Sequence, residues 1–242
     1  MEARLDRKLG SYFSRALTRH RSLLSQFHFE LKTGFGHMAS VAMRRSAFKG
    51  KSRLKVNIGC GASPLPGWIN VDVYPAPNIF FWDCRRSLPF EDESVDIIFA
   101  EHVFEHFAHP LETGPFLAEC LRCLHSDGVL RIVVPDAGRY ISLYPQGLEA
   151  FVAVRPLSTD HEGFRDHWLG SLYETPMELI NAVFRQGHQH KFAYDAETLC
   201  LHLRKAGFGA AIHQAFGVTK WTEEPPDTPE RATESLYVEG VK

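Results

Sequence analysis

The chain has 242 residues, of which 44% are apolar, a proportion typical of a globular protein with one substantial core. No apolar stretch approaches the ~18 residues that a membrane span requires, and no apolar segment with a cleavage site suggests a signal peptide. Five irregularly spaced cysteines argue against a disulfide framework, so we expect a reducing compartment, the cytoplasm.

The N-terminal arm, residues 1–53, differs from the rest of the chain in charge. The first 55 residues hold 13 Lys and Arg against three acids, whereas the remainder holds 14 against 26. Apolar residues recur at three- and four-residue steps from Leu5 to Leu31, which predicts an amphipathic helix flanked by arginines. Gly34 and Gly36 are expected to end this helix and to begin a linker. We interpret the arm as a solvated helix, although its charge also suits nucleic acid or a membrane surface.

From residue 54 onwards, short apolar runs rich in Ile, Val and Phe alternate with helical patterns. Such runs are typical of buried strands in a largely parallel sheet. One helix is predicted at 111–124 with Thr113 as its N-cap, and another at 195–208 is capped by Asp195 and stopped by Gly207. The predicted strands lie at 54–59, 68–73, 78–83, 95–101, 128–136, 209–216 and 234–241. The sequence therefore predicts an α/β domain over residues 54–242.

Residues 137–194 do not fit this alternation and are rich in aromatic residues and histidine. Connections that leave the carboxyl ends of parallel strands line the ligand crevice of an open sheet. We therefore expect this insertion to form the substrate side of the domain. His188, His190, Lys191 and Tyr194 are predicted to bind substrate at its end. The alternative is a hydrogen-bonded loop that anchors the following helix.

The motif VNIGCG at 56–61 places two glycines where a predicted strand ends. Glycine tolerates positive φ and lets another molecule approach the backbone. Asp72 ends the next strand, where a carboxylate can accept from ribose hydroxyls, and Asp83 ends the third, near an adenine amine. The dinucleotide fingerprint is not met, because Pro64 replaces its third glycine and Asp72 follows Gly61 by eleven residues rather than about twenty. A nucleoside without pyrophosphate, S-adenosylmethionine, fits better.

Four stretches together resemble the class I S-adenosylmethionine-dependent methyltransferases, and within them a type 11-like bacterial subgroup often linked to glycan biosynthesis. They are VNIGCG, GWINVD, DCRRSLPFEDESVDIIFAEHVFEH and HKFAYDAETLCLHLRKAGF. The resemblance spans roughly residues 54–240 and implies a doubly wound, mostly parallel seven-stranded sheet whose last strand is reversed. The cofactor contacts that it implies are Gly59, Cys60, Gly61, Asp72, Asp83, Cys84 and Glu101.

Two positions depart from the family pattern. Asn57 stands where the first motif usually opens with an acid. The segment from Cys60 to Gly67 is too short for the usual first crossover helix, because a parallel connection normally needs a dozen or more residues. We therefore expect a tight connection braced by its prolines.

AEHVFEHF follows the fourth predicted strand, at the sheet edge where the transferable methyl would lie. Transfer to a hydroxyl needs a base, and neutral histidine suits that task near pH 7. His102 is the predicted base, oriented by Glu105 or His106; in the alternative, these residues merely pack or cap a short helix. The same residues spell H-x-x-E-H, an inverted zinc-peptidase pattern that would need a further carboxylate such as Glu174 or Glu178.

The sequence thus predicts a cytoplasmic S-adenosylmethionine-dependent O-methyltransferase without a resident metal. The resemblance suggests a sugar hydroxyl of a surface glycan or lipo-oligosaccharide as acceptor, for example a nodulation signal. The alternatives are a small metabolite, an RNA engaged by the basic arm, a nucleoside-binding module without catalysis, and a zinc peptidase.

Overall fold

The computed structural model of the chain describes residues 24–43, 46–160, 163–167 and 170–242. The chain divides into two compact units, Met1–Arg45 and Ser46–Lys242. The second unit begins before residue 54, because the buried Phe48 ring packs against Phe80 and Phe90. No helix within the described ranges is both long and apolar enough to cross a bilayer.

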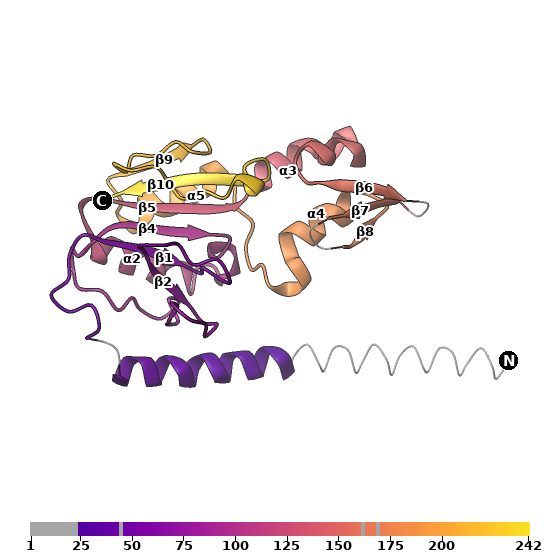
Figure 1. The fold of residues 1–242 in the computed structure, drawn as a ribbon. Coiled ribbons are helices and arrows are strands. Elements are labelled where there is room, and N and C mark those ends of the chain that lie inside the picture. The colour runs from indigo at the N-terminus through magenta and orange to yellow at the C-terminus, as the bar shows by residue number, and fades with distance from the viewer. Residues whose placement is uncertain (1–23, 44–45, 161–162, 168–169) are drawn as a thin grey trace, which may run out of the picture. The chain divides into compact units, whose positions relative to one another are not determined.

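The first unit contains a helix at residues 24–43 (Figure 1), and the earlier part of the predicted arm lies outside the described residues. The expectation that Gly34 and Gly36 end the helix is wrong, because the helix runs through both. Each glycine costs a helix about 1 kcal/mol relative to alanine. Good helix formers on both sides, such as Leu31 and Met38, offset that cost.

The second unit is built on a seven-stranded sheet in the order β3-β2-β1-β4-β5-β10-β9, which confirms the predicted fold class (Figure 1). Neighbouring strands are parallel except at β10, which runs antiparallel to β5 and to β9. The central strands are almost continuously apolar because they are buried on both faces. The strands are β1 (Leu54–Ile58), β2 (Ile69–Asp72), β3 (Phe80–Phe81), β4 (Val95–Glu101), β5 (Leu124–Pro135), β9 (Ala210–Gln214) and β10 (Ser235–Val241).

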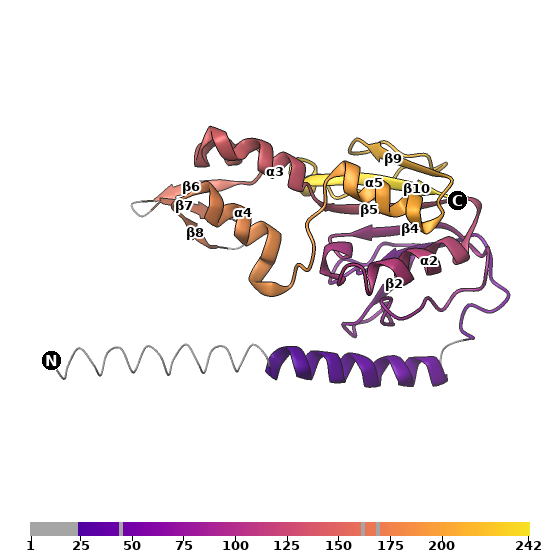
Figure 2. The same cartoon turned by 180° about the vertical axis from the view of Figure 1, so that it is seen from behind.

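Two helices, α2 (Thr113–Cys123) and α5 (Ala196–Ala206), pack against each other and against the sheet (Figure 2). The caps of α5 are as predicted, since the Asp195 carboxylate accepts from the Thr198 N–H at 2.8 Å and Gly207 ends the helix with φ 102°. The predicted N-cap of α2 is wrong. The helix already includes Thr113, so Glu112 occupies the N-cap position. The Glu112 side chain does not cap the helix, because its carboxylate accepts from the Ala108 N–H instead.

Loops add to the cover of the sheet. Leu65 and Trp68, from the β1–β2 connection, pack on a cluster of Phe99, Val133 and Tyr237. The Trp68 ring also meets Trp221, from the connection between β9 and β10, edge to face. That second connection therefore contributes to the packing.

Arg131 fixes the same loop from inside β5, where its side chain is fully buried. Its guanidinium donates to Asp227 Oδ1 at 2.7 Å, to Glu239 Oε1 at 2.8 Å and to the Val218 carbonyl at 2.9 Å. The antiparallel register places Glu239 directly opposite Arg131. A buried cation is tolerated here because two carboxylates and backbone carbonyls surround it.

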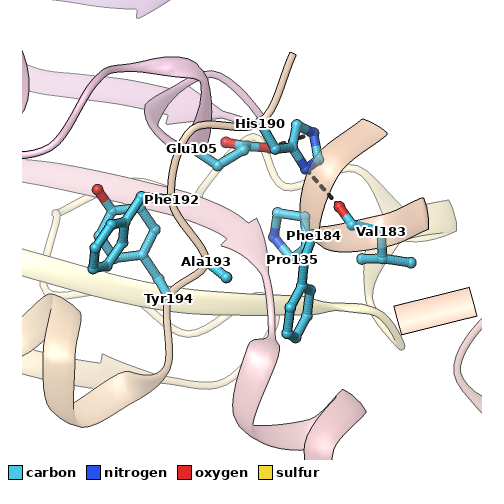
Figure 3. Close-up of a pocket in the computed structure, with 8 residues that line it drawn as sticks. All are labelled: Glu105, Pro135, Val183, Phe184, His190, Phe192, Ala193 and Tyr194. Atoms are coloured by element: carbon cyan, nitrogen blue, oxygen red, sulfur yellow. Dashed lines mark hydrogen bonds and ion pairs between the residues drawn. The ribbon is translucent and has the colours of Figure 1, made fainter. Parts of the chain in front are cut away.

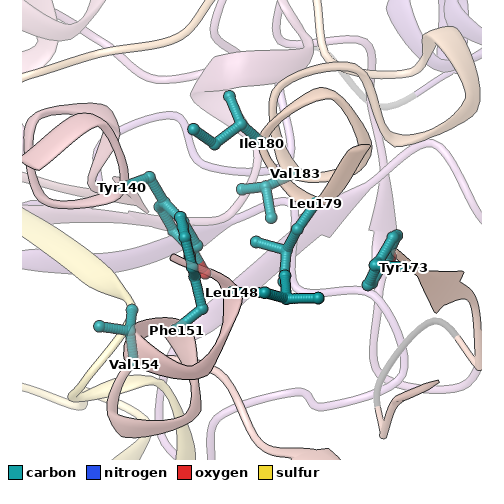
Figure 4. Packing of buried hydrophobic residues seen from close by; sticks show 8 residues of the cluster. All are labelled: Tyr140, Leu148, Phe151, Val154, Tyr173, Leu179, Ile180 and Val183. Atoms are coloured by element: carbon teal, nitrogen blue, oxygen red, sulfur yellow. The ribbon is translucent and has the colours of Figure 1, made fainter. Parts of the chain in front are cut away.

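The insertion, residues 137–194, forms a layer of its own beyond the carboxyl end of β5 (Figure 1). It has a separate hydrophobic core, which includes Tyr140, Phe151 and Leu179 (Figure 4). Its longer elements are α3 (Ala137–Leu143), α4 (Pro176–Arg185) and a small sheet of β6 (Leu157–Asp160), β7 (Gly163–Asp166) and β8 (Leu172–Tyr173). The short 3-10 helices of the unit are η1 (Phe104–His106), η2 (Tyr144–Gln146), η3 (Leu148–Ala153), η4 (Gln186–His188) and η5 (Pro229–Arg231).

Candidate active site

The connection between β1 and β2 is a short crossover without a helix, as predicted. Asn70 braces it, because its Oδ1 accepts from the Leu65 N–H at 2.8 Å and its Nδ2 donates to the Leu65 carbonyl at 2.9 Å. Asn57, which replaces the usual acid, is buried and donates to the same Asn70 Oδ1 at 2.9 Å. A neutral amide pair therefore holds the start of the site, and no buried charge needs a counter-ion.

The two glycines of VNIGCG serve different purposes. A Cβ at Gly59, where φ is 70°, would lie 2.5 Å from Val103 Cγ2, so glycine is required there by the packing of the chain itself. At Gly61, where φ is 53°, a Cβ would meet open space. The Gly61 N–H donates to Asp72 Oδ2 at 2.8 Å, and the Tyr74 N–H donates to Oδ1 at 2.9 Å. The carboxylate keeps further lone pairs, so an open cradle with an acceptor group fits an adenosine.

Asp83 lies two residues beyond the end of β3, and two arginines donate to its carboxylate. Arg85 and Arg86 donate to both oxygens of Asp83, whose side chain is 1% exposed. Burial alone would raise the pKa of Asp83, but these hydrogen bonds outweigh it and hold the pKa below its usual value. A contact of Asp83 with adenine would have to replace one of these bonds.

Burial raises the pKa of the Cys60 thiol to about 11 and that of Cys84 well above its usual value. Both sulfurs are therefore neutral at pH 7 and are not nucleophiles. Glu101 accepts from the Thr228 N–H at 3.1 Å and from the Thr228 hydroxyl, so its carboxylate binds the β9–β10 connection. Burial raises the pKa of Glu101 as well.

His102 follows β4 with a φ of 51° and its side chain is mostly buried. Nε2 lies 2.9 Å from Ser235 Oγ on β10, and Nδ1 lies 3.5 Å from Glu105 Oε1. Burial, with nearby Arg231, holds the pKa of His102 well below its usual value. The imidazole is therefore neutral at pH 7, and Glu105 lies beside Nδ1 without a hydrogen bond to it. Ser235 is a contact that no pattern in the sequence indicates.

Glu105 is a buried carboxylate in which neither oxygen has a hydrogen-bond donor among the described residues. Burial raises its pKa to about 8. His190 reaches it from the loop before α5, with Nε2 3.8 Å from Glu105 Oε1 (Figure 3). The backbone holds this arrangement, because the Glu105 carbonyl accepts from the N–H groups of Lys191 at 2.7 Å and Phe192 at 3.3 Å.

The four residues predicted to bind substrate divide into two pairs. His190 and Tyr194 are turned inward and line a small pocket with Glu105 (Figure 3). His188 lies at the surface beside Arg185, and the exposed Lys191 Nζ donates to the His188 carbonyl at 2.8 Å. The loop also anchors the following helix, since the Tyr194 carbonyl accepts from the Ala137 N–H at 2.9 Å. The structure thus joins the inner pair to the predicted catalytic residues.

The side chains of the H-x-x-E-H residues do not converge as the metal site of a peptidase would require. η1 is a single 3-10 turn, and His102 precedes it and faces Ser235. Glu178 completes a capping box with Thr175 at the start of α4. The ring of His106 instead packs edge-on against His190, with ring centroids 4.7 Å apart.

A family model for a methyltransferase domain matches residues 79–132, from just before β3 into β5. The matched segment lies in a sheet whose strand order and reversed β10 are those of the Rossmann-like methyltransferase fold. The match to a methyltransferase domain indicates S-adenosylmethionine as the methyl donor.

Several solved structures are similar to the chain at low sequence identity. A methyltransferase from Archaeoglobus fulgidus is 18% identical, with 90% of this chain and 99% of that chain covered and a TM-score of 0.47. A possible histamine N-methyltransferase from Thermotoga maritima is 18% identical, with 92% and 97% covered and a TM-score of 0.44. The 1,6-didemethyltoxoflavin-N1-methyltransferase of Burkholderia thailandensis is 15% identical, with 96% and 86% covered and a TM-score of 0.43. No curated protein sequence matches the chain.

Proposed function

We propose that the protein transfers the methyl group of S-adenosylmethionine to an oxygen acceptor. The observation that carries this proposal is the pair of His102 and Glu105 at the end of β4, next to the Gly59 turn. A sulfonium already activates its methyl carbon, so the chain mainly has to align the acceptor with it. A neutral amine attacks with its own lone pair, whereas a hydroxyl must also lose a proton. A buried proton acceptor at this edge therefore supports hydroxyl chemistry.

In the proposed reaction, Asp72 receives the ribose hydroxyls and the open space at Gly61 lets the cofactor approach the backbone. Cys60 and Cys84 contribute as neutral, buried neighbours of that cradle. His102 takes the proton of the acceptor hydroxyl as the oxygen bonds to the methyl carbon. Glu105 Oε1 lies 3.5 Å from Nδ1 of the imidazolium that forms, and this new positive charge favours the ionised form of Glu105, which balances it.

The acceptor that we favour is a sugar hydroxyl of a glycan or lipo-oligosaccharide, as the sequence resemblance suggests. The insertion offers an acceptor side, because its core is separate from that of the sheet and it adjoins the His102–Glu105 pair through His190. We also propose a cytoplasmic location, which agrees with five free, buried thiols.

An acceptor panel tests the proposal. The purified protein is incubated with methyl-labelled S-adenosylmethionine and paired acceptors: neutral oligosaccharides, matching amino sugars, small metabolites and RNA. We expect the label on a hydroxyl oxygen of the saccharides. Label confined to amines or to RNA would contradict an oxygen acceptor.

His102→Ala separates catalysis from binding in the same assay. We expect kcat/KM to fall by ~10²–10⁴, the usual contribution of a general base, while affinity for S-adenosylhomocysteine stays unchanged. His213→Ala, at an exposed position on β9, is the matched control and should leave both quantities unchanged. A fall of less than about threefold in His102→Ala would exclude the proposed base.

A further inference from the structure

Three potential metal ligands from two distant segments meet beyond β4. They are Glu105 and His106 of η1 and His190 of the loop before α5, and one ligand atom from each lies within 4.8 Å of the other two. Tetrahedral coordination with bonds of about 2.1 Å would place these atoms about 3.4 Å apart. Binding therefore requires the side chains to move inward by about 1 Å, which rotation about their terminal bonds supplies.

His190 already has the tautomer that a metal ligand needs. Its Nδ1 lies 2.6 Å from the Val183 carbonyl oxygen, which can only accept a hydrogen bond, so Nδ1 carries the proton. Nε2 therefore presents a lone pair, and it faces Glu105 Oε1 at 3.8 Å. Metal-bound histidines are commonly oriented in this way, by a hydrogen bond from the other ring nitrogen to a backbone carbonyl.

The Glu105 carboxylate lacks a partner of its own. The residue is 2% exposed, and neither oxygen has a hydrogen-bond donor among the residues that the structure describes. A buried polar group in a protein is normally satisfied, so this one requires an explanation. When Glu105 is ionised, its Oε1 and His190 Nε2 are two lone-pair-bearing atoms 3.8 Å apart, with no donor from the described residues between them. A bound cation would satisfy both.

A small cavity adjoins the cluster, and His106 does not line it. Glu105 and His190 form its polar side, and Pro135, Phe184 and Tyr194 are among the residues that close it (Figure 3). It has room for about one water-sized species and is too small for an acceptor molecule. The apolar walls lower the local dielectric constant, which strengthens the attraction between a cation and its ligands.

We propose that Glu105, His106 and His190 bind one divalent transition-metal ion, with zinc as the best match. Two imidazoles and one carboxylate suit zinc, whereas magnesium and calcium prefer oxygen ligands alone. Glu105 binds through one oxygen, and a water completes the coordination. The sequence led us to expect no resident metal, and the proposal departs from that expectation. It also differs from the H-x-x-E-H pattern, because His190 takes the place of His102 as a ligand.

The consequence is a link between η1 and the loop before α5, the two segments that carry the inner residues of the site. This inference goes beyond the proposed function, because the ion's role is to hold these segments together and no step of methyl transfer depends on it. The test can therefore read metal binding and stability without measuring turnover.

Cobalt(II) is the probe, because a site with two imidazoles and a carboxylate gives it a visible absorption band. Untagged, full-length protein is stripped with chelator, dialysed and titrated with Co²⁺, and Zn²⁺ is then added in competition. We expect one saturable equivalent that Zn²⁺ displaces. Glu105→Gln and His190→Gln should each weaken Co²⁺ binding at least about 100-fold, since even the loss of an outer contact to a metal ligand costs 10–100-fold. Absence of a saturable site in the wild-type protein would overturn the proposal.

His188→Gln is the matched control, because His188 lies on the same loop but outside the cluster. It should bind Co²⁺ as the wild-type protein does. Circular dichroism establishes that each variant is folded. Thermal unfolding gives a second, independent measurement: Zn²⁺ should raise the Tm of the wild-type protein and of His188→Gln but leave that of Glu105→Gln unchanged. Equal stabilisation of Glu105→Gln would overturn the assignment of the carboxylate as a ligand.

Discussion

Replacing Glu105 by glutamine should change how the stability of the protein depends on pH. Burial raises the pKa of Glu105 from 4.5 to about 8 in the folded state. Because the folded pKa is raised, the folded protein keeps a proton that the unfolded chain releases above pH 4.5. The resulting stability is complete below that pH and is lost as the pH rises through 8. One proton changes the free energy of unfolding by about 1.4 kcal/mol per pH unit, so the window contributes at most about 5 kcal/mol.

The assay is urea unfolding of metal-free protein between pH 5 and 8.5, with the wild type and Glu105→Gln compared at each pH. Their difference isolates Glu105, because every other group contributes equally to both. The variant should gain on the wild type by about 1.4 kcal/mol per pH unit. Glu119→Gln is the control: hydrogen bonds from Arg122 lower the pKa of Glu119, which therefore titrates below this window. If the free energies of unfolding of the wild type and Glu105→Gln changed with pH in parallel, the claim that burial raises the pKa of Glu105 would be refuted.

Further predictions concern the packing around the site. Arg131→Ala removes the guanidinium that pairs with two buried carboxylates and should lower the free energy of unfolding by about 3–5 kcal/mol in urea; a loss below about 1 kcal/mol would contradict the network. Gly59→Ala brings a Cβ within 2.5 Å of Val103 and should lower the Tm, and the added Val103→Ala should restore part of the loss. No recovery in the double variant would argue against the steric explanation. Residues 46–242 alone should unfold at the Tm of the full chain, because they form a compact unit, and a fall of more than about 5 °C would contradict that division.

The strands of the sheet could be predicted because short, continuous stretches of sequence specify each of them. Each central strand is a short run of Val, Ile and Phe, and Asp72 ends the β2 run, where parallel topology aligns it with the glycine turn. The two ends of α5 could be predicted for the same reason, because the N-cap Asp195 and the C-cap Gly207 lie next to the helix in the sequence. The helix through Gly34 shows the opposite case, because the residues around a glycine can outweigh its own preference.

The contact between Glu105 and His190 depends on interactions between distant segments, which no local sequence pattern encodes. His190 meets Glu105 because backbone N–H groups of its loop bind the Glu105 carbonyl and because its ring is held by the Val183 carbonyl. Backbone groups look alike in every sequence, so neither bond has a residue signature. Arg131 did leave a signal: a lone arginine within a buried run, with Glu239 at the facing position of a later run, indicates a buried ion pair across two strands.

Calorimetric titration of S-adenosylhomocysteine into the wild-type protein and into Asp72→Asn tests the central claim most directly. The account predicts one binding site in the wild type. It also predicts an affinity at least about tenfold lower in the variant, because a hydrogen bond to a charged acceptor is stronger than one to a neutral amide. Circular dichroism verifies that the variant is folded. A wild-type protein that does not bind, or an Asp72→Asn variant that binds equally well, would contradict the assignment of this cradle to the cofactor.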